Sequence, residues 1–155
     1  AKLAPVLEAS ALAKQLGIHV EITNLIIPGV NDSLDELREL SKWAYKNLGP
    51  ETPLHFTRFH PQYKMQNLSP TPVKTMQEAC KIATEEGMKY VYMGNVPGSK
   101  RNNTFCPNCG KMLIKRGFFE IENYDITPEK TCPKCGEHIP IVGEYVGTKQ
   151  VPHEY

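Results

Sequence analysis

The chain has 155 residues, enough for one ordinary domain or for one domain and a smaller module. Its 18 basic and 17 acidic side chains leave a formal net charge of +1, so the basic excess of a typical nucleic-acid-binding protein is missing. No apolar run reaches the roughly 18 residues of a membrane span, and the start has no signal-peptide pattern. We therefore expect a soluble, cytoplasmic protein that binds neither nucleic acid nor membrane.

Residues 1–98 alternate between helical and strand-like segments. The spacing of apolar residues predicts helices over 5–16, 33–48 and 71–86, and Ser33 with Glu36 fits a capping box at the start of the second. Runs of β-branched and aromatic residues predict strands over 18–27, 54–59 and 89–93. The strands begin roughly 35 residues apart, which is typical of successive βα units with parallel strands. Because a barrel needs about eight strands, we expect residues 1–98 to be the last part of a larger α/β barrel or open sheet.

Ligands of parallel α/β proteins bind at the carboxyl ends of the strands, where Arg58, His60 and Asn95 lie in this sequence. Strand alternation places Phe56, Arg58 and His60 on one face. If that face points inward, Arg58 can meet an anionic group of a ligand, and His60 can meet a ribose, a carboxylate or a ring. The alternative is that Arg58 pairs with a core carboxylate and that His60 only caps the strand. The loop that follows, as far as Thr71, is long enough to indicate a working surface.

Four of the five cysteines form two C-P-x-C-G motifs, 22 residues apart: Cys106, Cys109, Cys132 and Cys135. Each motif can aim two thiolates at one ion, and four thiolates complete the tetrahedral shell of a structural zinc site. Iron in a rubredoxin-like site is the rival interpretation, because the same ligands accept it. We expect a small zinc ribbon over residues 101–143 and a poorly ordered tail over 144–155. The fifth cysteine, Cys80, lies on the apolar face of a predicted helix.

Four segments in order carry a family resemblance: NLIIPGVND at 24–32, HFTRFHP at 55–61, YVYMGNVPG at 90–98 and TFCPNCG at 104–110. Together they resemble the C-terminal half of the AmmeMemoRadiSam-system radical SAM enzymes, relatives of the pyruvate formate-lyase activating enzymes. The resemblance implies a partial TIM barrel, of which residues 1–100 hold the last three βα units. In that family a 4Fe-4S cluster binds S-adenosylmethionine and cleaves it reductively to a 5′-deoxyadenosyl radical.

By the same resemblance, His60 aligns with a histidine beside the bound S-adenosylmethionine, and Asn95 lies where the family approaches the adenine. Thr23 stands where these relatives often carry an arginine that reaches the same ligand, and Arg58, taken to share its face, would compensate. The family's C-x3-C-x2-C cluster motif has no counterpart in this sequence. We therefore expect this chain to be inactive alone.

These observations predict the C-terminal portion of a radical SAM enzyme, which helps to position S-adenosylmethionine and carries a structural zinc ribbon. Its expected partner is the missing N-terminal half of the barrel, on the same or another chain, and a protein is a candidate substrate of the whole enzyme. The alternative is a stand-alone zinc-ribbon interaction module whose α/β part completes the sheet of a partner.

Overall fold

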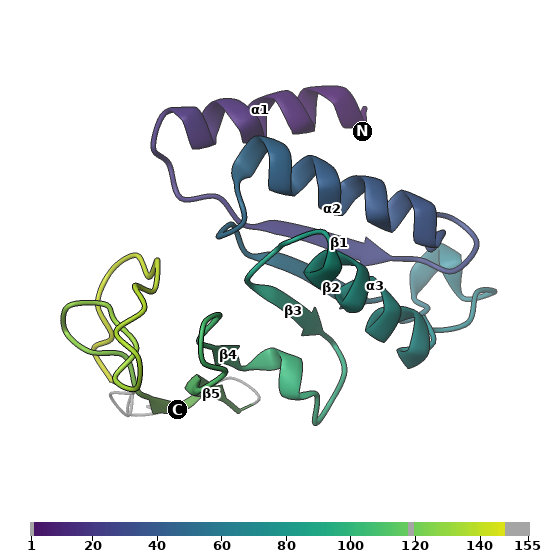
Figure 1. The fold of residues 1–155 in the computed structure, drawn as a ribbon. Helices are drawn as coiled ribbons and strands as arrows, with labels where there is room; N and C mark the ends of the chain where they lie inside the picture. Colours follow the sequence, from purple (N-terminus) through teal and green to yellow (C-terminus); the bar gives the residue numbers. More distant parts are fainter. Residues whose placement is uncertain (1, 118–119, 148–155) are drawn as a thin grey trace, which may run out of the picture. The chain divides into compact units, whose positions relative to one another are not determined.

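The chain forms two compact units in a computed structural model, which describes residues 2–117 and 120–147 (Figure 1). We call residues 1–101 the α/β unit and residues 102–155 the ribbon unit. The α/β unit contains, in chain order, α1 (Leu3–Gln15), β1 (Ile22–Ile26), α2 (Leu34–Leu48), β2 (Leu54–Arg58), the 3-10 turn η1 (Tyr63–Met65), α3 (Val73–Glu85) and β3 (Val91–Gly94). A second 3-10 turn, η2 (Lys100–Asn102), spans the boundary between the units.

The three strands of the α/β unit form one parallel sheet in the order β1-β2-β3. Ile22 pairs with Leu54, and Leu54 pairs with Val91, so these three side chains share a face of the sheet. The mixed α/β class and the parallel sheet that the sequence predicts are thereby confirmed.

Helices α2 and α3 pack on the same face of this sheet (Figure 1). Leu37 and Ala44 of α2 and Met76 and Ala83 of α3 recur at helical spacing, which aims them at the sheet. Burial of their side chains together with those of the strands builds the core: Ile26, Leu54, Phe56, Ala79, Cys80, Met88, Val91 and Met93.

The opposite face of the sheet is open. Thr23 is exposed and Leu25 keeps 42% of its surface accessible, so no element among the described residues covers this part of the face. Helix α1 has no buried residue, although apolar side chains lie all around it, and Leu3 and Leu12 are 69% and 55% exposed. In the described part of the chain, no helix has the length and hydropathy that crossing a membrane requires.

Two local predictions in the α/β unit are wrong. The first strand begins at Ile22 and not at residue 18, because its ladder with β2 starts at the Ile22–Leu54 pair and Ile18 is 55% exposed. Ser33 is the N-cap residue of α2, but its side chain makes no capping hydrogen bond, so the predicted capping box does not form.

The ribbon unit is built on an antiparallel sheet of β4 (Thr104–Phe105), β5 (Met112–Arg116) and β6 (Ile121–Tyr124). Its separate core includes Leu113, Ile114 and Ile139. Residues 118–121 also have the composition of a short strand; the structure begins the last strand at Ile121, and Phe118 lies outside the described residues. Of the predicted tail, residues 144–147 are described, and Tyr145 stacks on Tyr124 with ring centroids 4.6 Å apart. Residues 148–155 lie outside the described range.

Candidate metal centre

The two cysteine motifs form loops with the same backbone hydrogen bonds. In the first loop the Gly110 N–H donates to the Cys106 carbonyl over 3.0 Å, and in the second the Gly136 N–H donates to the Cys132 carbonyl over 2.9 Å. Gly110 and Gly136 have φ angles of 70° and 76°, in the left-handed region that favours glycine. The glycine that ends each C-P-x-C-G motif therefore allows the chain to turn back and leave two sulfurs on the same side.

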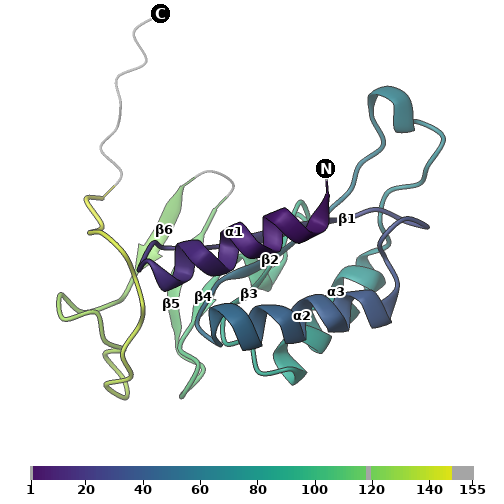
Figure 2. The same cartoon turned by 90° about the horizontal axis from the view of Figure 1, so that it is seen from above.

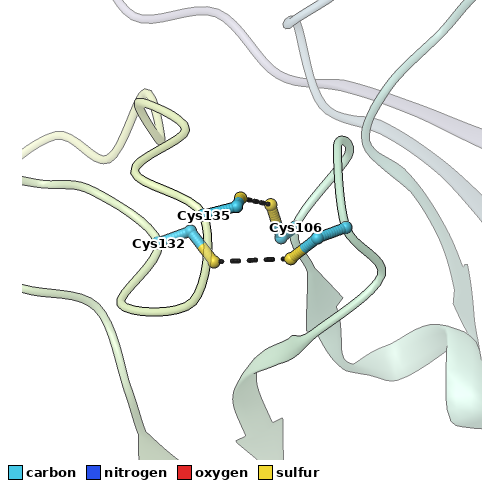
Figure 3. Close-up of side chains that lie close together, drawn as sticks. Cys106, Cys132 and Cys135 are labelled. Atoms are coloured by element: carbon cyan, nitrogen blue, oxygen red, sulfur yellow. Dashed lines mark hydrogen bonds between the residues drawn. The ribbon is translucent and has the colours of Figure 1, made fainter.

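The four sulfur atoms lie close together, all within 4.8 Å of one another (Figure 3). The Cys106 and Cys135 sulfurs are 3.5 Å apart, and those of Cys109 and Cys132 are 3.7 Å apart. A zinc–sulfur bond of about 2.3 Å in a tetrahedron places neighbouring sulfurs about 3.8 Å apart, whereas a disulfide requires about 2.05 Å. The geometry therefore fits one four-sulfur metal site and no disulfide.

The thiol pKa values of Cys106 and Cys132 are shifted in opposite directions. Desolvation raises the pKa of the Cys106 thiol to about 12, against the lowering effect of two backbone amides of its own loop. For Cys132, desolvation also raises the pKa, but hydrogen bonds from the Lys134 and Cys135 amides and from neighbouring thiols outweigh it and lower the pKa to about 7. Hydrogen bonds with neighbouring thiols thus raise the pKa of Cys106 and lower that of Cys132, so Cys132 is the first of the two to lose its proton. A bound cation favours the deprotonated form of both thiols.

The four ligands differ in exposure, because Cys135 is exposed and Cys109 is half-buried. Cys106 and Cys132 are 2% and 1% exposed and belong to the core of the ribbon unit, with Leu113 and Ile139. Four thiolates fill a tetrahedral shell and leave no position for water or substrate. The four cysteines can therefore hold a metal ion, and their number and geometry are compatible with zinc.

The predicted ligand-binding residues lie at the carboxyl ends of the strands of the α/β unit. Arg58 donates from Nε to the Thr71 carbonyl over 2.7 Å, and it forms no salt bridge with the described residues. It therefore does not pair with a core carboxylate, the alternative that the sequence left open. Asn95 has a φ of 58°, and its Nδ2 donates to the Arg58 carbonyl over 3.2 Å, which links the ends of β3 and β2. His60 is exposed, and within the described chain its side chain makes no hydrogen bond.

Thr23 and Arg58 lie on different faces of the sheet. Thr23 pairs with His55 on the open face, whereas Arg58 pairs with Ile26 and follows the buried Phe56 on the helix-covered face. The expectation that Arg58 shares the face of Thr23 is therefore wrong, and the face of Phe56 and Arg58 points toward the helices and not toward the open side of the sheet. Of the four candidates, the structure brings Arg58 and Asn95 into contact through the Arg58 carbonyl and leaves Thr23 apart.

Sequence reasoning missed three polar residues that organise the sheet. The Asn31 side chain accepts from the Ile27 N–H over 2.7 Å and donates to the Leu25 carbonyl over 3.0 Å, which closes the turn after β1. The Thr71 hydroxyl bonds both to β1 and to the residue after β2. On the open face, Glu21 accepts hydrogen bonds from two histidines. The Pro-Gly-Val-Asn-Asp run around Asn31 is a local signal of a turn. The bonds of Thr71 to Ile26 and of Glu21 to His55 have no such signal, because these partners lie 45 and 34 residues away in the sequence.

The chain is similar to an uncharacterized protein of the archaeon Methanocaldococcus jannaschii. The two are 54% identical over 144 residues, which cover 92% of this chain and 43% of the relative. The chain thus spans less than half of the length of this relative. No family model matches the chain.

Proposed function

We propose that the α/β unit is the last three βα units of a radical SAM barrel and that the ribbon unit is a structural zinc ribbon at its end. The observation that carries the proposal is the sheet order β1-β2-β3 together with α2 and α3 on one face. Each new strand of a barrel is added beside the previous one, with every helix outside. A doubly wound sheet reverses its strand order and covers both faces with helices.

The open face supports the same proposal. Parallel sheets are stable when both faces are covered, and here Thr23 and Leu25 are exposed. In a closed barrel this face becomes the packed interior. The relative from Methanocaldococcus is more than twice as long as the segment that matches, so a longer protein of this kind has room for further strands. The partner of the open face is then the N-terminal half of the barrel, on the same or another chain.

The cysteines of this chain do not fit an iron–sulfur cluster of the radical SAM type. The four clustered sulfurs complete one ribbon site, and Cys80 is fully buried in the α/β core with its sulfur 3.9 Å from the Tyr92 carbonyl. No further cysteine remains. The cluster ligands belong to the missing half, and we assign no step of the radical reaction to the residues of this chain.

In the complete enzyme, the role of this chain is to position S-adenosylmethionine at the carboxyl edge of the sheet. When bound to the complete enzyme, this cofactor supplies a 5′-deoxyadenosyl radical that abstracts a hydrogen atom, with a protein as candidate substrate. His60 is exposed at that edge with its ring nitrogens unused by the described residues, so it is free to bind the cofactor. Asn95 holds the neighbouring strand end in place through the Arg58 carbonyl. Reduced thiolates at the ribbon site fit a cytoplasmic protein.

The test is the dissociation constant for S-adenosylmethionine of the longer protein, measured by calorimetry. His60→Ala removes a ring that we place against the cofactor and is expected to raise this constant about tenfold. Gln62→Ala, two residues along on the same exposed loop, is the matched control and is expected to bind normally. An unchanged constant in His60→Ala removes His60 from the binding site.

A second experiment tests whether this chain is inactive alone, and binding by the longer protein then separates the proposal from its rival, a stand-alone zinc-ribbon module. This chain, reconstituted anaerobically with iron and sulfide, is expected to form no 4Fe-4S cluster and to cleave no S-adenosylmethionine. Cleavage by this chain alone would contradict the account. If the longer protein also fails to bind S-adenosylmethionine, the interaction module that completes a partner's sheet becomes the better reading.

A further inference from the structure

A threonine side chain is inserted between the carboxyl ends of β1 and β2. The last paired residues of the two strands are Ile26 and Arg58, and the first bond of this ladder runs from the Ile22 N–H to the Pro53 carbonyl. This parallel register requires the Phe59 N–H to donate next to the Ile26 carbonyl. Instead the Thr71 hydroxyl stands between the two groups: it accepts from the Phe59 N–H over 3.1 Å and donates to the Ile26 carbonyl. The two strands therefore part at this point.

The backbone of Thr71 holds the same strand end from the other side. Its N–H donates to the Phe59 carbonyl over 3.2 Å, and its carbonyl accepts from Arg58 Nε over 2.7 Å. Thr71 is fully buried. Four hydrogen bonds thus converge on one residue, which closes the base of the protruding loop that spans residues 60–70 and carries η1 (Figure 2).

Thr52 shows what an ordinary buried threonine does in this fold. It is 1% exposed, and its hydroxyl donates over 2.9 Å to the Leu48 carbonyl, four residues earlier in the same segment. That bond ties a local turn at the amino end of β2. Thr71, by contrast, bonds to Ile26 of β1 and also to Phe59 and Arg58, which lie 12 and 13 residues before it. These bonds lie at the carboxyl end of the strands, opposite to the turn that Thr52 ties.

We propose that Thr71 is the positioning residue of His60, an inference that rests on the proposed binding of S-adenosylmethionine at this edge. His60 follows Phe59 directly, and its exposed side chain has no hydrogen bond to the described residues, so the backbone sets its place. Without the hydroxyl, the Phe59 N–H and the Ile26 carbonyl can pair directly and extend the ladder by one bond. The end of β2 then closes on β1 and carries His60 with it.

The test compares Thr71→Val, which replaces the hydroxyl with a methyl group that cannot form hydrogen bonds, with Thr71→Ser, which keeps the hydroxyl. Thr52→Val is the matched control, because it removes a buried hydroxyl of equal exposure from the same unit. In the longer protein, T71V is expected to raise the dissociation constant of S-adenosylmethionine about tenfold, while T71S and T52V stay within about twofold of wild type. In this chain, the amide NMR signals of Phe59 and His60 are expected to move in T71V and to stay in place in T52V.

A double-mutant cycle with His60→Ala shows whether Thr71 acts through His60. If it does, T71V has no further effect on binding once His60 is alanine. Full additivity of the two losses, or normal binding by T71V, overturns the inference while leaving the proposed function intact. Failure of the wild-type longer protein to bind S-adenosylmethionine overturns the proposed function, and this inference with it. Should T71V not fold, Thr71→Cys, whose thiol is a weak donor, is expected to give an intermediate loss of binding, and wild-type binding by it would contradict the proposal.

Discussion

The Nε2 atom of His55 lies 2.9 Å from one carboxylate oxygen of Glu21, and His19 Nε2 lies 3.0 Å from the other oxygen. The His55 ring also stacks on Tyr92, with ring centroids 4.9 Å apart and an interplanar angle of 20°. This cluster joins the residue before β1 to β2 and β3 across the open face. Hydrogen bonds and one ring stack thus join the three strands on that side.

Because the pKa of the Glu21 carboxyl is shifted, this cluster is expected to affect how the stability of the α/β unit changes at acidic pH. Desolvation raises this pKa, but the hydrogen bonds and charges of His19 and His55 outweigh it, and the pKa lies below its ordinary value of 4.5. A carboxyl with a lowered folded-state pKa stabilises the fold above its unfolded-state pKa, and the stabilisation is lost as the pH falls through the folded-state value. Because Glu21 is 49% exposed, we expect a contribution below about 1 kcal/mol.

Urea unfolding between about pH 6 and pH 3 measures this contribution. Trp43 is the only tryptophan and packs against the α/β core, so its fluorescence reports this unit alone. Glu21→Gln is expected to flatten the loss of stability below pH 4.5, and Glu39→Gln, in an exposed pair with Lys42, serves as the control. Equal pH profiles for wild type and E21Q would contradict the assigned role of the cluster.

Cys106→Ser is expected to lower the metal content of the purified chain from about one ion per chain to well below it, because three thiolates and a hydroxyl hold a thiophilic ion poorly. The ribbon unit then loses its fold, since Cys106 lies in its core. Metal analysis by mass spectrometry and the amide signals of residues 104–117 follow both effects. Zinc in the natural protein would exclude the iron interpretation, and iron with red colour would replace it.

Cys80→Ala is the matched control for the cysteine experiment. Cys80 is fully buried in the α/β core and its weak contact is with the Tyr92 carbonyl, so its loss is expected to leave the metal content unchanged. The cavity costs the α/β unit about 1 to 2 kcal/mol of stability. A fall in metal content in C80A would mean that the fifth cysteine contributes to a metal site after all.

Removal of the metal by a strong chelator is expected to unfold the ribbon unit and to leave the α/β unit intact. The two units have separate cores, one centred on Phe56 and the other on Leu113, and the metal site belongs to the second. Metal binding supplies much of the folding free energy of so small a unit. Chelation should therefore erase the amide dispersion of residues 104–117 while Trp43 fluorescence stays constant. A change in both signals together would show that the units fold as one.

The sequence predicted those features that depend on local pattern. Two C-P-x-C-G motifs need no tertiary context, since each loop sets its own geometry, and all four sulfurs meet as expected. The βα spacing likewise predicted a parallel sheet. Alternation alone, however, does not say which face the helices cover. Arg58 therefore received a role on the face of Thr23, whereas it follows Phe56 on the helix-covered face.

Features that depend on partners distant in the sequence stayed hidden. The Thr71 hydroxyl bridges to Ile26, 45 residues earlier, and Glu21 bonds to His55, 34 residues later. Neither residue belongs to a motif, and both contacts exist only once the strands have paired. The start of β1 could not be predicted for the same reason. Residues 18–21 are suited to a strand, but the register with β2 begins only at the Ile22–Leu54 pair.

A polar substitution on the open face tests whether that face is covered in the longer protein. Leu25 is 42% exposed here, so Leu25→Gln is expected to change the stability of this chain by less than about 0.5 kcal/mol. In a closed barrel the same side chain is buried, and an amide without a partner there costs about 1 to 3 kcal/mol. Leu34→Gln, 48% exposed at the start of α2 on the helix-covered side, is the control, since helices remain outside a barrel. A larger loss for L25Q than for L34Q in the longer protein, with equal small effects in this chain, supports closure of the barrel. Equal effects in both proteins would mean that the open face stays open and that the partial sheet is used in some other way.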